Sequence, residues 1–128
     1  MNGRRSDPVL ADFAEPLPQV PDLEKGDAGE RMNALGRALH KITRGVVRIT
    51  LGPEEKARRW NIGLAPGGAK VAEGDAGEPD LELITSEETW SEIIGGRLSP
   101  LDAFTGGRIR VLGDVELARL MFRALRRS

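Results

Sequence analysis

The chain has 128 residues, a length at which one hydrophobic core and one domain are expected. Its 19 Lys and Arg residues nearly balance 20 Asp and Glu residues, and the net charge of −1 removes most of the electrostatic support for nucleic-acid binding. The absence of cysteine excludes disulfides, thiolate nucleophiles and Cys-based metal sites, and the single histidine, His40, excludes a metal site built from several histidines.

The first 26 residues differ in composition from the rest of the chain. They are rich in proline, including Pro16, Pro18 and Pro21, and their acidic residues outnumber their basic ones. Their apolar residues recur at neither the strand nor the helix period. We predict a flexible, acidic, proline-rich leader over residues 1–26 and one folded domain over residues 27–128.

Residues 27–51 predict a helix followed by a strand. The segment Asp27-Ala-Gly-Glu30 is typical of a capping box at a helix start. Apolar residues then recur at helical spacing through Ile42, and glycine at position 45 is typical of a residue that ends a helix. Alternation over Val46 to Leu51 indicates a strand with one apolar face.

Three further strands are predicted before residue 85. They are marked by Trp60, Ile62 and Leu64, by the segment 70–73, and by Leu81 with Leu83. Glycine and proline at 52–53 and 66–68 favour short turns between the first three strands. Three consecutive strands joined in this way predict an antiparallel meander, and with the helices the fold class is α+β.

The last third of the chain predicts two helices, a strand and a final helix. The segment Thr85-Ser-Glu-Glu88 indicates a second capping box, before a helix that ends at the glycines 95–96. Ser99 and Pro100 begin a short helix that the glycines 106–107 end. The segment 109–111 is a fifth strand, and Asp114 caps a last helix that runs through residue 125.

These patterns contain no catalytic apparatus. His40 lies off the apolar stripe of its helix, which predicts a solvated position. Adjacent acids on a helix do not converge on one point, and the loop acids between residues 73 and 80 lack the ligand spacing of a calcium loop. The paired glycines match neither phosphate-binding pattern. On the last helix one side carries cations, which form a solvated face or bind anionic headgroups or a partner: Arg119, Arg123, Arg126 and Arg127.

Two motifs between residues 86 and 114 are specific enough to indicate a protein family. Residues 96–104 read GRLSPLDAF, which contains G-x-L-x-P-x-x-A-F, and residues 107–114 read GRIRVLGD, which contains G-x-[IL]-x-[IV]-x-G-[DN]. With the Ser- and acid-rich helix start at Ser86, they resemble the sterol carrier protein 2 (SCP-2) family. The strand from Trp60 to Leu64 and the segment from Pro79 to Leu83 also resemble this family, so the resemblance covers residues 30–128.

The resemblance implies a five-stranded, largely antiparallel sheet covered on one face by helices, with an apolar tunnel between the layers. Such a tunnel holds a sterol, a fatty acid or an acyl chain without covalent chemistry or a cofactor. Ala103 and Phe104 would then lie side by side beneath the sheet. The candidate ligand-binding residues are Ile62, Leu64, Leu83, Trp90, Ile94, Leu98, Phe104, Val111, Leu117, Leu120 and Met121.

Two other functions remain open from the sequence. One is a cofactor-free enzyme of the cyclase or dehydratase type, for which a buried Asp102 or Asp80 would be the acid. The other is an interaction module with a collapsed cavity, which docks through Arg119, Arg123 and Arg126.

The expected location of the protein follows from the segments that the sequence lacks. No apolar stretch reaches the roughly 20 residues that span a bilayer, and the chain begins without the apolar segment of a signal peptide. It also ends without a peroxisomal signal. We therefore expect a cytoplasmic protein. The bias of Arg over Lys, with abundant Ala and Gly, suggests a bacterial genome of high GC content, and with the resemblance we expect a small stand-alone bacterial member of the family.

Overall fold

The computed structural model describes residues 26–74 and 77–125. Most of the predicted leader, and Arg126 and Arg127, lie outside the described residues. The helices are α2 (Ala28–Leu39), α3 (Glu87–Ile94), α4 (Pro100–Thr105) and α5 (Val115–Leu125), with a 3₁₀ turn at Glu54–Lys56. The strands are β1 (Gly45–Leu51), β2 (Arg58–Ala65), β3 (Gly68–Glu73), β4 (Leu81–Thr85) and β5 (Ile109–Gly113).

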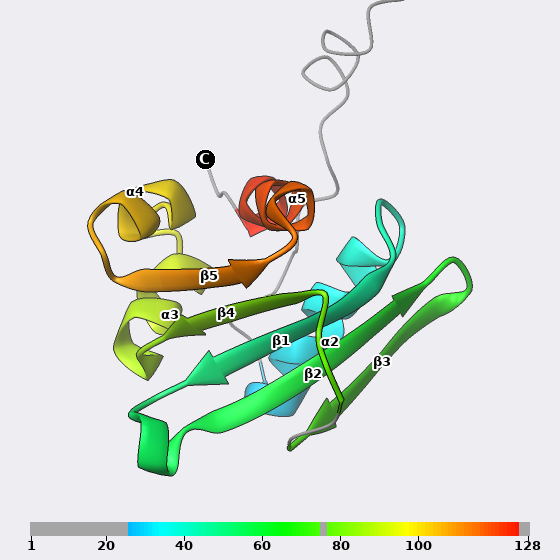
Figure 1. Ribbon diagram of the computed structural model, residues 1–128, viewed down its shortest axis with the longest axis horizontal. Coiled ribbons are helices and arrows are strands. Elements are labelled where there is room, and N and C mark those ends of the chain that lie inside the picture. The colour runs from blue at the N-terminus through cyan, green and yellow to red at the C-terminus, as the bar shows by residue number, and fades with distance from the viewer. Residues whose placement is uncertain (1–25, 75–76, 126–128) are drawn as a thin grey trace, which may run out of the picture.

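The five strands form one sheet in the order β3-β2-β1-β4-β5 (Figure 1). β1, β2 and β3 make the predicted antiparallel meander, and β5 is antiparallel to β4. β4 lies parallel to β1, on the side of β1 opposite β2. The prediction of an α+β fold with a largely antiparallel five-stranded sheet is confirmed.

One face of the sheet is apolar and packs against the helices. The register places Val47 beside Ile62 and Leu81, and Ile49 beside Leu83, so these side chains point to the same face. All five are buried. α2 contacts β2 and β3, whereas α5 contacts β4 and α2. Figure 1 shows the helices gathered on this inner face and beside β5.

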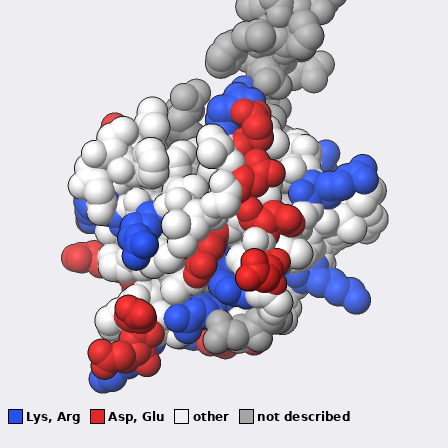
Figure 2. All heavy atoms as spheres, viewed as in Figure 1, with Lys and Arg blue, Asp and Glu red and all other residues white. Residues whose placement is uncertain are grey.

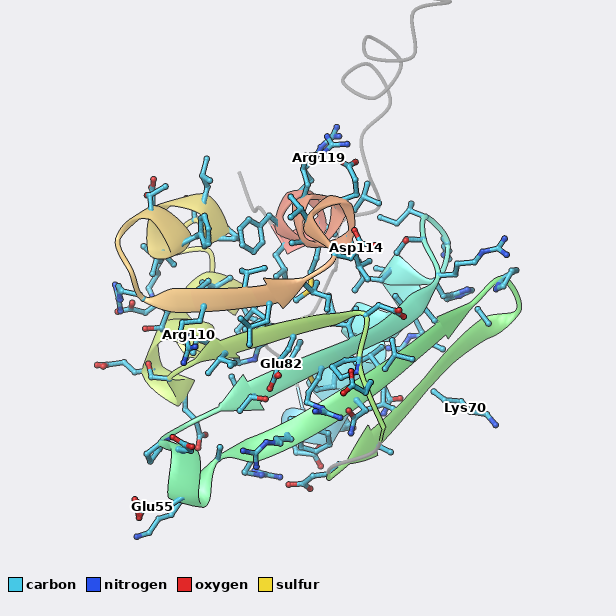
Figure 3. All side chains as sticks on the ribbon, in the orientation of Figure 1. Glu55, Lys70, Glu82, Arg110, Asp114 and Arg119 are labelled. Carbon is cyan, nitrogen blue, oxygen red and sulfur yellow. The ribbon has the colours of Figure 1, made fainter. Side chains whose placement is uncertain are left out.

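The outer face of the sheet is polar. Arg48 Nε donates to Asn61 Oδ1 at 2.9 Å, and Thr50 Oγ1 donates to Glu82 Oε2 at 2.8 Å. Figure 3 shows Glu82 on the side of the sheet opposite α2, and Figure 2 shows acidic side chains across this face. The alternation seen in the sequence thus divides the sheet into an inner apolar face and an outer polar face.

The first helix is about one turn shorter than the apolar spacing predicts. Its capping box is confirmed: Glu30 N donates to Asp27 Oδ1 and Asp27 N to Glu30 Oε1, both at 2.8 Å. The helix ends at Leu39, and the backbone N–H of Ile42 donates back to Leu39 O at 3.0 Å. Ile42 therefore belongs to a turn, although it still packs on the core, which explains why its spacing matched a helix.

The second predicted capping box is wrong by one residue. Thr85 belongs to the end of β4, where its Oγ1 donates to Arg108 O at 2.7 Å. Ser86 caps α3 instead, because its Oγ accepts from Thr89 N at 3.0 Å. The other two starts are confirmed: Ser99 caps α4, and Asp114 Oδ1 accepts two backbone N–H groups at the start of α5.

Candidate functional site

The eleven candidate ligand-binding residues fall into two groups by burial. Seven are buried in the core between the sheet and the helices: Ile62, Leu64, Leu83, Trp90, Ile94, Leu117 and Met121. Four are more exposed and come from the segment 98–120: Leu98, Phe104, Val111 and Leu120. We call the seven buried residues the inner wall and the four more exposed residues the rim. The rim lies around α4, β5 and α5.

The inner wall is assembled from elements far apart in the chain. Leu83 faces the same side as its β5 neighbour Val111, because the two are paired in the register. Leu117 and Met121 lie four residues apart on α5, so they face the same direction. Since α5 contacts β4, these side chains close the apolar layer over that half of the sheet.

The rim residue Phe104 does not lie where the sequence suggested. Its neighbour Ala103 is fully buried, but the Phe104 side chain is 45% exposed, so the expectation that both lie beneath the sheet is wrong for Phe104. Consecutive helical residues point about 100° apart, and α4 turns only one of them inward. The Phe104 ring instead meets Phe122 of α5, with ring centroids 6.0 Å apart and planes at 59°.

Phe122 is a rim residue that the sequence reasoning missed. It follows the buried Met121 and lies off the stripe used to select candidates on α5. Phe122 lies four residues after Ala118, which is buried, so helical spacing could have indicated that Phe122 is near the core. The pair of rings joins α4 to α5 across the outer side of the apolar layer.

A polar atom lies buried at the opposite end of the inner layer. Trp60 is only 7% exposed, and its Nε1 has no hydrogen-bond partner within the described part of the chain. The ring lies between Gly29 of α2 and the Arg58 guanidinium, whose Cζ is 5.2 Å from the ring centroid. An unpaired buried donor costs free energy in a native fold, so this N–H is an exception to the usual pairing of buried polar groups.

The Arg58 side chain also pairs with a carboxylate at the edge of the sheet. Its Nε donates to Glu73 Oε2 at 2.9 Å. This hydrogen bond and the positive charge hold the pKa of Glu73 below its usual value, and the carboxylate raises the pKa of Arg58. Both side chains are close to half exposed, so the pair adds little to stability.

An open hollow of about 560 Å³ lies beside the β2–β3 hairpin and the start of β1. Of the candidate ligand-binding residues, Leu64 alone contributes to its lining. The hollow is therefore not the tunnel that the resemblance implies, and that tunnel stays a prediction.

The carboxylates considered for an enzymatic role lie at the surface. Asp102 is exposed in the first turn of α4. Asp80 is exposed as well, and its Oδ2 accepts from Val46 N at 2.7 Å, which ties the start of β1 to the start of β4. The enzymatic role would need one of these two carboxylates to be buried, and neither is.

Other expected sites are placed as follows. His40 caps the end of α2 and is half-buried with Nδ1 shielded from solvent, whereas the sequence predicted a solvated helix position. Arg119 is exposed and pairs with Glu116 at 2.8 Å, and Arg123 is half-buried.

Over residues 26–74 and 77–125, no three His, Asp or Glu side chains gather into a possible metal site. None of the helices in these ranges has the length and apolar character needed to cross a membrane.

Comparison with known proteins agrees with this architecture. The sequence profile of the SCP-2 sterol transfer family matches residues 26–126. The chain is 34% identical over 97 residues to peroxisomal multifunctional enzyme type 2 of Mus musculus, which covers 73% of this chain and 13% of the mouse protein. It is 26% identical over 88 residues to peroxisomal multifunctional enzyme A of Dictyostelium discoideum. The chain thus corresponds to only 13% and 20% of these relatives.

Two solved structures show the same fold. The sterol carrier protein domain 2 of Helicoverpa armigera superposes with a TM-score of 0.60 at 26% identity, over 78% of this chain and 84% of that one. The palmitated SCP2L2 protein of Aedes aegypti superposes with a TM-score of 0.63 at 23% identity, over 77% of this chain and 90% of that one.

Proposed function

This chain belongs to the SCP-2 sterol transfer family, and from that premise we propose that it binds an apolar small molecule between the sheet and the helices. The ligand is a sterol, a fatty acid or an acyl chain. The protein carries it through the cytoplasm without changing it covalently. The observation that carries the proposal is the family match over residues 26–126, together with the apolar layer that the sheet and helices enclose.

The distribution of burial supports a ligand site that opens on one side. The inner wall is closed, with Ile62, Leu83 and Met121 almost fully buried. The rim around α4 and α5 is more accessible, since Leu98 and Leu120 are only partly buried. A bound aliphatic chain would separate the rim from the wall and replace the lost contacts, contributing roughly 25 cal/mol per Å² of apolar surface removed from water.

The Aedes aegypti relative adds a second line of support. That protein is described in its palmitated form, so this fold accommodates a long acyl chain. A palmitoyl chain is flexible and apolar, and its affinity for a site of this kind depends on chain length more than on polar contacts. Fatty acids are therefore the first ligands to test.

Non-catalytic carriage fits the positions of the carboxylates. Asp80 already accepts a backbone hydrogen bond, and Asp102 faces solvent, so neither is placed in the apolar layer as a proton donor would be. An enzyme of the cyclase or dehydratase type remains the alternative, and a product of altered mass would reveal it.

The proposal is tested by native mass spectrometry of the freshly purified full chain, followed by organic extraction of whatever is released. We expect a lipid of defined mass in one-to-one complex. Titration with saturated fatty acids of increasing length should then show affinity rising with length to a limit set by the site. A protein that carries no lipid and binds neither fatty acids nor sterols would contradict the proposal.

A further inference from the structure

One strand of the sheet has a glycine at a position where packing does not require one. Gly63 lies inside β2, between β1 and β3, and its backbone does not have the positive φ that favours glycine. A Cβ at Gly63 would lie 3.8 Å from Lys70 O, which is ordinary contact, so a side chain would fit there. Glycine weakens a strand, and inside one it often marks a place where a ligand or another backbone comes close.

The missing side chain of Gly63 helps to form the hollow beside the β2–β3 hairpin. The register places Val46 and Lys70 on either side of Gly63, so the three residues form one row across the outer face of the sheet. This row lines the hollow of about 560 Å³, and the other lining residues are glycine, alanine and leucine. The hollow therefore presents bare backbone and short apolar side chains to an incoming segment.

Cations border this hollow. Lys70 lines it, and Figure 3 shows the Lys70 side chain extending from β3 away from the sheet. Arg44 and Lys41 line a neighbouring hollow, to which Pro66 of the hairpin turn also contributes. Within the part of the chain that the structure describes, neither Arg44 nor Lys70 has an ion-pair partner. These cations are therefore available to an acidic segment.

A carboxylate borders the hollow as well. A Cβ at Gly45 would lie 2.8 Å from Asp80 Oδ2, so Asp80 stands at the edge formed by the start of β1. That oxygen already accepts a hydrogen bond from Val46 N at 2.7 Å. The three cations outnumber this carboxylate, so the charge around the hollow favours an acidic partner over a basic one.

The acidic, proline-rich leader of the chain has matching chemistry. Residues 7–24 contain five acidic residues and no lysine or arginine. Within them, residues 12–18 read DFAEPLP, with two acids, two large apolar residues and two prolines. Proline-rich segments lose little entropy on docking, because proline already favours the extended polyproline II conformation. The family profile begins at residue 26, so the leader lies outside the matched domain.

The leader joins the folded domain within reach of the hollow. It ends at the start of α2, and the end of α2 lies beside the hairpin turn, since His40 and Pro66 line one hollow. α2 has 12 residues and is therefore about 18 Å long. A polyproline II chain advances about 3.1 Å per residue, so about six residues span this length. Residues 12–18 therefore reach the hollow, and the short connection keeps them near it at a high effective concentration.

We propose that residues 12–18 dock in the hollow over Gly63 of the same molecule. The two apolar side chains of the segment cover the lining, while its two acids pair with Arg44 and Lys70. Leu64 belongs both to this lining and to the inner wall, so the docked segment contacts the apolar layer from its end. The docking needs no bound ligand, so it stands apart from the proposed function.

The test uses the absence of cysteine from the chain. Ala14→Cys gives a single site for a nitroxide label inside residues 12–18, and the label broadens the magnetic resonance signals of nearby amides. In the isotope-labelled full chain, we expect the amides of residues 63–70 to lose most of their intensity, while those of residues 104–107 keep theirs. Raising the salt concentration should restore part of the lost intensity, since salt screens the attraction between the acids and the cations.

A substitution that fills the hollow tests its role directly. Gly63→Val should abolish the broadening, and the fold should survive because a Cβ has room there and valine favours a strand. The matched control is Ala72→Val, at an exposed position on β3 outside the hollow. The control should leave the broadening as it is in the unchanged sequence.

A second pair of variants tests the charges. Arg44→Glu/Lys70→Glu should restore the signals, because it replaces two cations at the hollow by acids. Lys56→Glu/Arg110→Glu changes the net charge equally at exposed positions outside the hollow, and it should leave the broadening unchanged. This pair keeps the test decisive if Gly63→Val does not fold.

Other outcomes would overturn the proposal. Full intensity at residues 63–70, or broadening centred on α4 and α5 instead, would show that the segment does not dock in the hollow. Equal recovery in each variant and its control would show that the hollow is not the cause. Spin-labelled protein is also mixed with isotope-labelled protein that carries no spin label, and broadening in that mixture would mean that the segment docks on a second copy.

Discussion

Asp80 illustrates how a single residue at the surface joins segments that are far apart in the chain. Its Oδ2 accepts from Val46 N at 2.7 Å, and its own N–H donates to Val46 O at 2.8 Å. Its carbonyl oxygen accepts from Asp114 N at 2.8 Å, just after β5. Asp80 therefore joins the start of β1, the start of β4 and the turn that leads into α5.

Substitution of Asp80 should affect stability and leave ligand chemistry unchanged. We expect Asp80→Ala to lower the free energy of unfolding by about 0.5–1.5 kcal/mol, because it removes the side-chain acceptor of Val46 N. Asp80→Asn keeps an acceptor oxygen and should lose less. Urea denaturation followed by circular dichroism measures both, and equal losses in the two variants would show that the hydrogen bond is not the cause.

We predict that Phe104 influences which ligand is selected. We expect Phe104→Ala to alter the preferred fatty-acid length while the protein stays folded, because the side chain lies at the rim and is 45% exposed. Its ring contact with Phe122 contributes only about 0.5–1.5 kcal/mol. Displacement of a fluorescent fatty acid measures the preference.

The control for Phe104 is Leu101→Ala on the same short helix, which faces solvent more fully. This variant should keep the chain-length preference of the unchanged protein in solution. A Phe104→Ala variant with the same ranking of fatty acids as the control would remove Phe104 from the ligand site.

At the scale of elements, the approach of α2 to the sheet depends on one small residue. A Cβ at Gly36 would lie 2.9 Å from Ala69 Cβ and 3.1 Å from Ile62 Cγ2, closer than side chains pack. At Gly29 in the same helix, a Cβ would have 3.4 Å or more to its neighbours. The two glycines therefore differ in the space around them, although both are helical.

The two alanine substitutions in α2 should have opposite effects. We expect Gly36→Ala to lower the free energy of unfolding by about 1–3 kcal/mol, because overpacking outweighs the better helix propensity. Gly29→Ala should raise it by up to about 1 kcal/mol, because the propensity gain comes without a clash. Thermal and urea denaturation test this. Similar changes in both variants would mean that α2 can shift away from β3 without loss.

For the molecule as a whole, the cations of the last helix lead to a prediction of how a ligand is delivered. Charge reversal at Arg119 and Arg123 should slow transfer of a fluorescent fatty acid to anionic vesicles more than it weakens binding in solution. The reason is that both cations belong to α5 and neither is among the buried residues of that helix. Transfer rates and solution affinities are measured side by side, and equal effects on both would contradict docking through this helix.

The positions that sequence reasoning placed wrongly share a physical cause. Thr85 is a good capping residue, but tertiary pairing with β5 extends β4 through it and moves the cap to Ser86. Ile42 has helical spacing, yet a turn places it on the core after α2 has ended. In both cases local propensity is weak, and contacts made by distant residues decide the outcome.

The candidate site was predictable in part. The alternation around Ile62 and Leu83 correctly marked the inner face of the sheet, because a strand exposes every second residue to the same side. The direction of Phe104 and the involvement of Phe122 were not predictable, because α4 is too short for a stripe to reveal which side faces inward.

The sequence by itself determined the composition of the two faces of the sheet, most helix starts and the family, since these depend on local spacing and on motifs between residues 86 and 114. Only the tertiary structure decided that β4 returns parallel to β1, that Asp80 and Asp102 stay at the surface, and that the Phe104 ring of α4 meets the Phe122 ring of α5. These features depend on which segments become neighbours in space. That choice is made by the packing of the whole core, and no local pattern in the chain encodes it.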